Sequence, residues 1–250
     1  MNGSTIDVKT TDGTADCYLT KPADGEKNPG VLLIMDAIGM RARIHEMADR
    51  VAAQGYVVLA PNVFYRAGRA PQWDMPNLAD ENERAEFFKK LGPLMGELKA
   101  DGGAKAASDG TAYLDKLAEL SPGPVAVVGY CMGGWFAWTL AATHPDRVAA
   151  VGGFHTGHMV SEDDDSPHLL APKVKAEVYW GHADQDHSMT PENIATLDKA
   201  MDAAGVKHTT EVYTGASHGY TMSDMGAYNE AATERHFKAL FALLERTLSV

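Results

Sequence analysis

The sequence predicts an α/β fold, in which helices cover both faces of a mostly parallel sheet and an antiparallel hairpin lies at the N-terminus. Short and almost wholly apolar runs, such as VLLIMD at residues 31–36, are typical of strands that are buried on both faces. These runs alternate with segments of helical periodicity along nearly the whole chain, as expected for successive βαβ units. Because no internal repeat or long linker divides the sequence, residues 1–250 are expected to form a single domain.

The first half of the chain combines the hairpin with two buried strands. Apolar and polar residues alternate on both sides of the turn signal Thr11-Asp12-Gly13, which predicts the hairpin. A helix is expected where apolar residues recur at helical spacing, and a long polar connection follows the second buried strand. The expected elements are, in order, the hairpin 5–20, strand 31–36, helix 41–54, strand 56–61 and helices 80–91 and 103–120.

The second half repeats the alternation of strand and helix more regularly. Ser121, Pro122, Gly123 and Pro124 separate the preceding helix from the next buried run. The expected elements are, in order, strand 124–129, helix 132–143, strand 148–154, strand 175–181, helix 191–204, strand 208–215 and helix 227–248. Since ligand sites of such sheets lie beyond the carboxyl ends of the strands, functional residues are sought there.

The composition favours a soluble protein that acts on a small molecule. Apolar residues make up 45% and charged residues 22% of the chain, and no window approaches the apolar length that a membrane helix needs. The formal net charge of −12 disfavours nucleic acids and anionic membranes as partners, because both require clustered Lys and Arg. The start of the chain has no signal-peptide pattern, so a cytoplasmic location is expected. The protein is expected to be a monomer or a homodimer. Two cysteines are too few for a disulfide framework.

The stretch GYCMG at 129–133 places Cys131 between glycines, after an apolar strand and before a helix. In this context a Gly-x-nucleophile-x-Gly sequence forms an elbow that exposes one side chain above the sheet. The start of the helix supplies free backbone N–H groups and the positive end of the helix dipole, which favour both a thiolate and an oxyanion. On the pentapeptide alone, a buried and inert cysteine is an equally good interpretation.

A nucleophilic thiol requires a base within hydrogen-bond reach and a group that orients the base. His218, in GASHGY, and Asp184, in GHADQD, each directly follow a predicted strand. Together with the cysteine they stand in the chain order nucleophile, acid, histidine that the elbow motif predicts. Asp186 and His187 are the alternative acid and base, but the spacing from Gly181 favours Asp184.

On these residues the chain resembles the dienelactone hydrolase family, a branch of the α/β-hydrolases that uses a cysteine nucleophile. The resemblance covers essentially the whole sequence and is carried by VLLIMDAIGMR, RVAAQGYVVLAPNVFYR, VVGYCMGG, GHADQD and GASHGY. It implies the α/β-hydrolase fold and a thioester acyl-enzyme. It also implies Cys131 as the nucleophile, Asp184 as the acid and His218 as the base.

The resemblance further implies roles for residues at the end of the strand 31–36. Asp36 occupies the position of a family carboxylate that contacts the nucleophile, where founding members carry Glu. We expect it to gate the ionisation of Cys131, because a nearby carboxylate opposes thiolate formation unless it accepts the proton itself. The backbone N–H groups of Ala37 and Met132 are expected to form the oxyanion hole.

Tyr130, His155 and Tyr220 are candidates for lining the pocket, because each lies beside a catalytic residue or at a strand end. No cofactor or metal is expected, and the acidic run 162–165 is interpreted as a solvated loop. Founding members of the family bind a substrate carboxylate through an arginine shortly after the histidine, where this chain has Met222.

The sequence therefore predicts a cysteine-dependent hydrolase of small carboxylic esters or lactones, with a substrate less polar than a dienelactone. A non-catalytic binding protein on the same scaffold and a thiol redox sensor are the alternatives.

Overall fold

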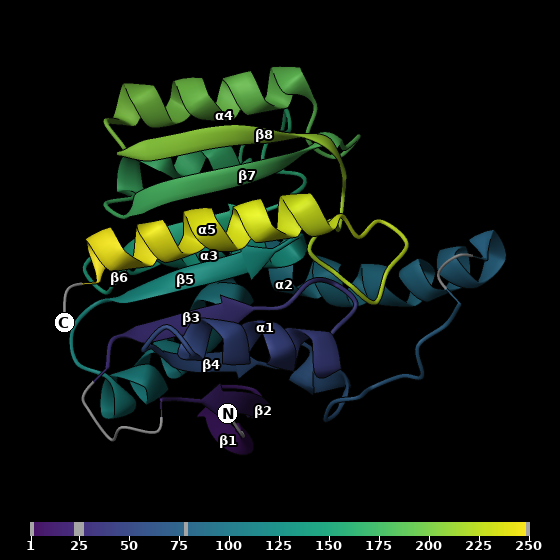
Figure 1. Ribbon diagram of the computed structural model, residues 1–250, viewed down its shortest axis with the longest axis vertical. Coiled ribbons are helices and arrows are strands. Elements are labelled where there is room, and N and C mark those ends of the chain that lie inside the picture. The colour runs from purple at the N-terminus through teal and green to yellow at the C-terminus, as the bar shows by residue number, and fades with distance from the viewer. Residues whose placement is uncertain (1–2, 23–27, 78–79, 249–250) are drawn as a thin grey trace.

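The computed structural model describes residues 3–22, 28–77 and 80–248. Its centre is an eight-stranded sheet in the order β1-β2-β4-β3-β5-β6-β7-β8 (Figure 1). The strands are β1 (Ser4–Thr10), β2 (Gly13–Thr20), β3 (Gly30–Ile34), β4 (Val57–Pro61), β5 (Val125–Tyr130), β6 (Val148–Phe154), β7 (Glu177–Gln185) and β8 (His208–Ser217).

The sheet is parallel from β4 to β8, and the N-terminal hairpin β1–β2 joins it antiparallel through β2 and β4. The predicted α/β fold with an antiparallel N-terminal hairpin is thereby confirmed. All residues of β3, β4 and β5 are buried, which explains why these strands appear in the sequence as unbroken apolar runs.

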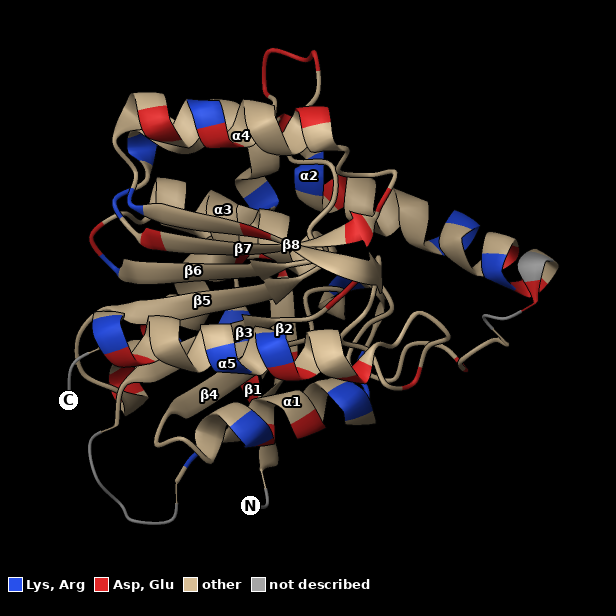
Figure 2. Cartoon of the chain, turned by 45° about the horizontal axis from the view of Figure 1, so that its top comes forward, with Lys and Arg blue, Asp and Glu red and all other residues tan. Residues whose placement is uncertain are grey.

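Helices cover both faces of the sheet. They are α1 (Ala42–Ala52), α2 (Glu81–Leu120), α3 (Met132–Thr143), α4 (Pro191–Ala204) and α5 (Glu230–Thr247), with the 3₁₀ helices η1 (Tyr65–Ala67) and η2 (Pro167–Lys173). Helices α1 and α5 lie on one face, and α2, α3 and α4 lie on the other (Figure 2). No helix among the described residues is both long and apolar enough to cross a membrane.

The two helices that the sequence predicts at 80–91 and 103–120 are both present within α2, but the first extends further than predicted. Asp80 caps its start by accepting hydrogen bonds from the N–H groups of Asn82 and Glu83. The helix then continues to a break at 100–103, where three successive residues have left-handed φ angles of 53° to 83°. Figure 1 shows the first half of α2 extending past the carboxyl ends of the strands. The helix thereby brings side chains from a distant part of the sequence to the edge where the functional residues are expected.

Strands β7 and β8 run further than the sequence predicts. Residue Ala183 of β7 pairs with Tyr213 of β8, and Gln185 pairs with Ser217. The pairing with its neighbour keeps β7 extended through a polar stretch that carries no strand pattern of its own. The first residue after β7 is therefore Asp186.

Candidate active site

Cys131 lies on the sharp turn between β5 and α3. Its φ of 54° and ψ of −116° are strained for a residue that has a side chain. The adjoining glycines are required by close approach of the backbone. A Cβ on Gly129 would lie 1.9 Å from the carbonyl oxygen of Gly133, and a Cβ on Gly133 would lie 2.5 Å from that of Ile34. The sequence therefore folds locally as the elbow that GYCMG predicts, with the thiol at the carboxyl end of the sheet.

His218 directly follows β8, and its imidazole connects the thiol to a carboxylate. Its Nε2 lies 3.0 Å from Cys131 Sγ, and its Nδ1 lies 2.6 Å from Asp186 Oδ2. Each of the three residues is the first after its strand, since they follow β5, β7 and β8. The carboxyl ends of these parallel strands meet at one edge, so residues up to 87 positions apart come into contact.

The prediction that Asp184 contacts His218 is wrong. Asp184 is still part of β7, and its exposed carboxylate accepts a hydrogen bond from the N–H of Gly215, at 2.9 Å. Asp184 is fixed within the strand, whereas Asp186 lies just beyond its end, where its carboxylate reaches His218. Asp186, the alternative in the sequence, is the acidic partner of His218.

Asp186 is held by more than the histidine. Its Oδ1 accepts hydrogen bonds from the N–H of Ser188 at 2.9 Å and from the Ser188 hydroxyl at 2.6 Å. Burial alone would raise the pKa of this carboxyl group, but the hydrogen bonds from His218 and Ser188 outweigh burial and lower the pKa. Asp186 therefore carries its negative charge at neutral pH and keeps its orientation toward the imidazole.

Burial disfavours the charged form of His218, but the negative charges of Cys131 and Asp186 outweigh this effect. Together they raise the pKa of His218 above its ordinary value. His218 therefore holds its proton more strongly than a free imidazole does, and it lies between the thiol and the carboxylate, the arrangement that a nucleophile, its base and an orienting group require.

In the part of the chain that the structure describes, Asp36 makes no hydrogen bond to Cys131. The prediction that Asp36 gates the ionisation of Cys131 is corrected accordingly. Its carboxylate accepts two hydrogen bonds from Arg41, at 2.7 and 3.0 Å, and one from the N–H of Ile38. Arg41 also binds Asp224. A two-point pair with a guanidinium is stronger than a hydrogen bond to a thiol, so the side chain turns away from the nucleophile.

A hollow of about 400 Å³ opens at Cys131. The first half of α2 also lines this hollow, through Phe88, Met95 and Lys99. Ala37 and Met132, the predicted oxyanion-hole residues, both line the hollow. Met132 is the first residue of α3, so its N–H has no acceptor within the helix. The lining residues are Ala37, Phe88, Met95, Lys99, Cys131, Met132, Gly157, His158, Gln185, Asp186, His187, Ser188 and His218.

A model of the dienelactone hydrolase family matches residues 15–248 of the chain. The chain belongs to the dienelactone hydrolase family. The resemblance inferred from the elbow and the two loops is thereby confirmed, and this member of the dienelactone hydrolase family is a hydrolase of the ester and lactone type.

Sequence relatives of this dienelactone hydrolase family member extend over most of the chain. A candidate carboxymethylenebutenolidase of Synechocystis sp. is 26% identical in an alignment 243 residues long, and the alignment covers 92% of this chain and 94% of that protein. Another, of Escherichia coli (strain K12), is 27% identical in an alignment 219 residues long, which covers 86% of this chain and 75% of that protein.

Solved structures share the fold at low sequence identity. A candidate dienelactone hydrolase from Klebsiella pneumoniae has a TM-score of 0.82 and 19% identity, with 97% of each chain covered. A dienelactone hydrolase-like promiscuous phosphotriesterase from metagenomic libraries has a TM-score of 0.79 and 19% identity, with 98% of each chain covered. These likenesses confirm the predicted α/β-hydrolase fold.

The three predicted pocket residues lie behind the hollow and do not line it. Tyr130, His155 and Tyr220 are fully buried. The Tyr130 hydroxyl lies 3.0 Å from Nε2 of His236, and the Tyr220 hydroxyl donates to the carbonyl of Gly181. His155 packs its ring edge-to-face against that of His218, with the ring centres 5.4 Å apart. These residues support the catalytic turns from below, because each belongs to a strand end or a loop that packs under them.

Several residues that line the hollow were missed by the sequence reasoning, among them one histidine and three residues of α2. His158 comes four residues after β6, in GGFHTGH, so its position near a strand end was a signal available in the sequence. Phe88, Met95 and Lys99 had no such signal, since they reach the hollow only through the direction in which α2 extends.

Proposed function

We propose that the protein hydrolyses small carboxylic esters or lactones with the Cys131 thiolate as nucleophile. In this proposal His218 transfers the protons and Asp186 orients His218. The observation that carries the proposal is the unbroken contact from sulfur to imidazole to carboxylate, at 3.0 and 2.6 Å. This is the geometry that an activated nucleophile requires.

In the first half of the reaction, the thiolate attacks the carbonyl carbon and forms a carbon–sulfur bond. The carbonyl oxygen becomes an oxyanion, and in this proposal the backbone N–H groups of Ala37 and Met132, two residues that line the hollow, bind it. The intermediate collapses to a thioester as the carbon–oxygen bond breaks, and the departing alkoxide takes the proton from the His218 imidazolium. The alcohol leaves; in a lactone it remains attached to the acyl group.

In the second half, water attacks the thioester. Neutral His218 accepts the proton of this water through Nε2, while Asp186 stabilises the imidazolium that forms. The carbon–sulfur bond breaks and the Cys131 thiolate returns. One water is consumed for each ester cleaved, and no cofactor takes part in these steps.

The test is turnover of a panel of activated esters and lactones by the native protein and by Cys131→Ala. Loss of a catalytic nucleophile typically lowers kcat by about 10⁴ to 10⁶, and a loss of this size is expected. The matched control is Cys17→Ala, which removes the second thiol from a buried position in β2. Equal turnover by the native protein and Cys131→Ala would refute the proposal.

The redox-sensor alternative receives less support. Cys17 is buried. The pKa of its thiol is raised, chiefly by burial and to a smaller extent by the negative charge of Asp16. A buried, protonated thiol in the hairpin is a poor resolving partner for an oxidised Cys131.

A further inference from the structure

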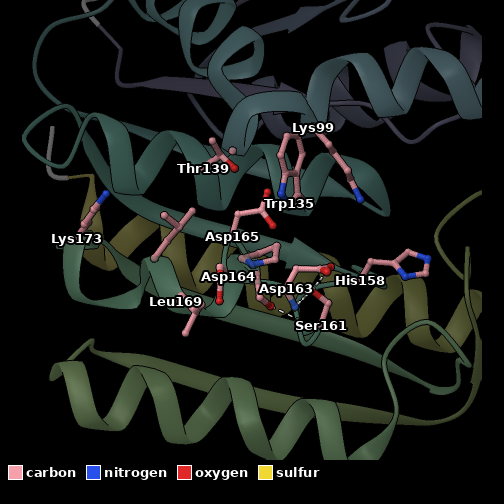
Figure 3. A pocket seen from close by; sticks show the side chains of 14 residues that line it. Lys99, Trp135, Thr139, His158, Ser161, Asp163, Asp164, Asp165, Leu169 and Lys173 are labelled. Carbon is pink, nitrogen blue, oxygen red and sulfur yellow. Dashed lines mark hydrogen bonds between the residues drawn. The ribbon is translucent and has the colours of Figure 1, made fainter.

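A second hollow, of about 560 Å³, is lined by residues of α2, α3 and the segment 158–173 (Figure 3). Lys99 and His158 line both hollows and so form a shared wall. Each volume lies in the range that small-molecule sites occupy. The two hollows are therefore neighbours, and a ligand long enough to reach from Cys131 past these two side chains would enter the second hollow.

A buried polar group in the wall of the second hollow lacks a partner. The side chain of Thr139 is only 1% exposed, and its hydroxyl makes no hydrogen bond within the described part of the chain. It comes from α3, one turn after Trp135, and Figure 3 shows both side chains on the same side of the hollow as Lys99. Because unpaired buried hydroxyls are rare and costly, a hydrogen-bonding ligand is the expected partner.

The charges around this hollow have both signs. Asp163, Asp164 and Asp165 are exposed along the opposite side, and none of them forms an ion pair with a described residue. Lys99 and Lys173 contribute ammonium groups to the same lining.

The mixture of charges selects among ligand classes. A cationic ligand would meet the ammonium groups as well as the carboxylates, and an anionic ligand the carboxylates as well as the ammonium groups, whereas an apolar ligand would desolvate charged groups without pairing them. A neutral ligand with several hydroxyl groups satisfies both signs, since each hydroxyl donates to a carboxylate and accepts from an ammonium.

We propose that the second hollow binds a sugar that forms the alcohol part of an ester cleaved at Cys131. This inference rests on the proposed hydrolase function and specifies its substrate class. The ester carbonyl lies at the thiolate, and the sugar hydroxyls pair with Asp164, Asp165 and Lys99. In the reaction the carbon–oxygen bond to the sugar breaks, the sugar oxygen takes the proton from His218, and water releases the acyl group from Cys131.

Four acetate esters that differ only in their alcohol test the inference. They are methyl 6-O-acetylglucoside, cyclohexylmethyl acetate with a ring of equal size but no hydroxyls, acetylcholine as the cation and 4-acetoxybutyrate as the anion. Because a hydrogen bond to a charged group contributes a factor of about 10 or more, kcat/KM is expected to be at least about 10-fold higher for the sugar ester.

Substitutions in the acidic loop then locate the preference. The double variant Asp164→Asn/Asp165→Asn is expected to lower kcat/KM for the sugar ester about 10-fold and to leave cyclohexylmethyl acetate within about 2-fold. These side chains are exposed, so the fold is expected to tolerate the change. The matched control is Glu162→Gln, which removes a charge from the same loop outside the hollow and should leave all four rates unchanged.

The results separate this inference from the proposed function. Equal kcat/KM for the sugar and cyclohexylmethyl esters, or a preference for the cation or the anion, overturns the sugar site even if turnover depends on Cys131. The same loss for Glu162→Gln as for the double variant also overturns it, because the effect is then one of general charge. Turnover of all four esters that does not depend on Cys131 would instead refute the hydrolase mechanism.

Discussion

Two histidines at different levels of burial have opposite electrostatics. His218, half-buried at the upper level, has acidic partners on both ring nitrogens, Cys131 and Asp186. His236, on α5, is fully buried at the lower level, and its hydrogen-bond partners within the described residues are neutral, the Tyr130 hydroxyl and the Thr233 carbonyl. Burial lowers the pKa of both imidazoles, but only in His218 do negative partners reverse the shift. The difference teaches that acidic partners can outweigh burial in deciding whether an imidazole in this fold holds a proton.

The largest expected effect follows from removing the upper imidazole. His218→Gln removes the group that activates the thiol and protonates the leaving alkoxide, so kcat/KM for an activated ester should fall by about 10⁴ to 10⁶. His236→Gln removes no proton-transfer group and should retain most of the activity. Steady-state kinetics of both variants measure the contrast, and comparable losses in the two variants would abolish the distinction between the levels.

A smaller effect is expected from the carboxylate that distinguishes the upper histidine. Asp186→Asn keeps the shape of the side chain but removes the charge that stabilises the imidazolium, and kcat should fall by about 10² to 10⁴. The matched control, Asp184→Asn, changes a carboxylate two residues away that contacts only the N–H of Gly215. We expect it to stay within about 2-fold of the native kcat. A larger loss for Asp184→Asn than for Asp186→Asn would restore the sequence-based assignment.

These two aspartates also mark how far the sequence predicts the site. Cys131 was predictable because it stands between glycines after an apolar strand, and His218 because it follows a predicted strand that ends at Gly215. The acid was placed two residues too early because the end of β7 is set by its pairing with β8, including Gln185 with Ser217. Strand pairing is a tertiary property, so periodicity within one segment does not predict where it stops.

The fold itself was predictable because burial on both faces leaves an unmistakable apolar run in β3, β4 and β5. The outer wall of the site was not. Phe88, Met95 and Lys99 reach the hollow because α2 continues past the sheet, and nothing in the local sequence of a helix specifies its direction in space. The ion pair of Asp36 with Arg41 was easier to predict, because Arg41 lies only five residues further along the chain.

The smallest expected effect is on stability, and it tests the lower level directly. Burial lowers the pKa of His236 to about 3, against an ordinary value of 6.5. Between these values the unfolded chain binds a proton that the folded chain does not, so stability is fully present above pH 6.5 and is lost as the pH falls toward 3. A group of this kind contributes a slope of about 1.4 kcal/mol per pH unit in that window.

Urea unfolding at pH 7.5, 6 and 5 measures this slope. His236→Gln should lower the slope below pH 6.5 by about 1.4 kcal/mol per pH unit, even if the substitution destabilises the protein at pH 7.5. His218→Gln is the matched control, because the folded pKa of His218 is raised, so its contribution is complete below pH 6.5 and is lost only as the pH rises. Removing His218 should therefore leave the acid slope unchanged. If His236→Gln unfolds with the native slope, its imidazole is already protonated in the folded protein, and the two levels differ in position but not in electrostatics.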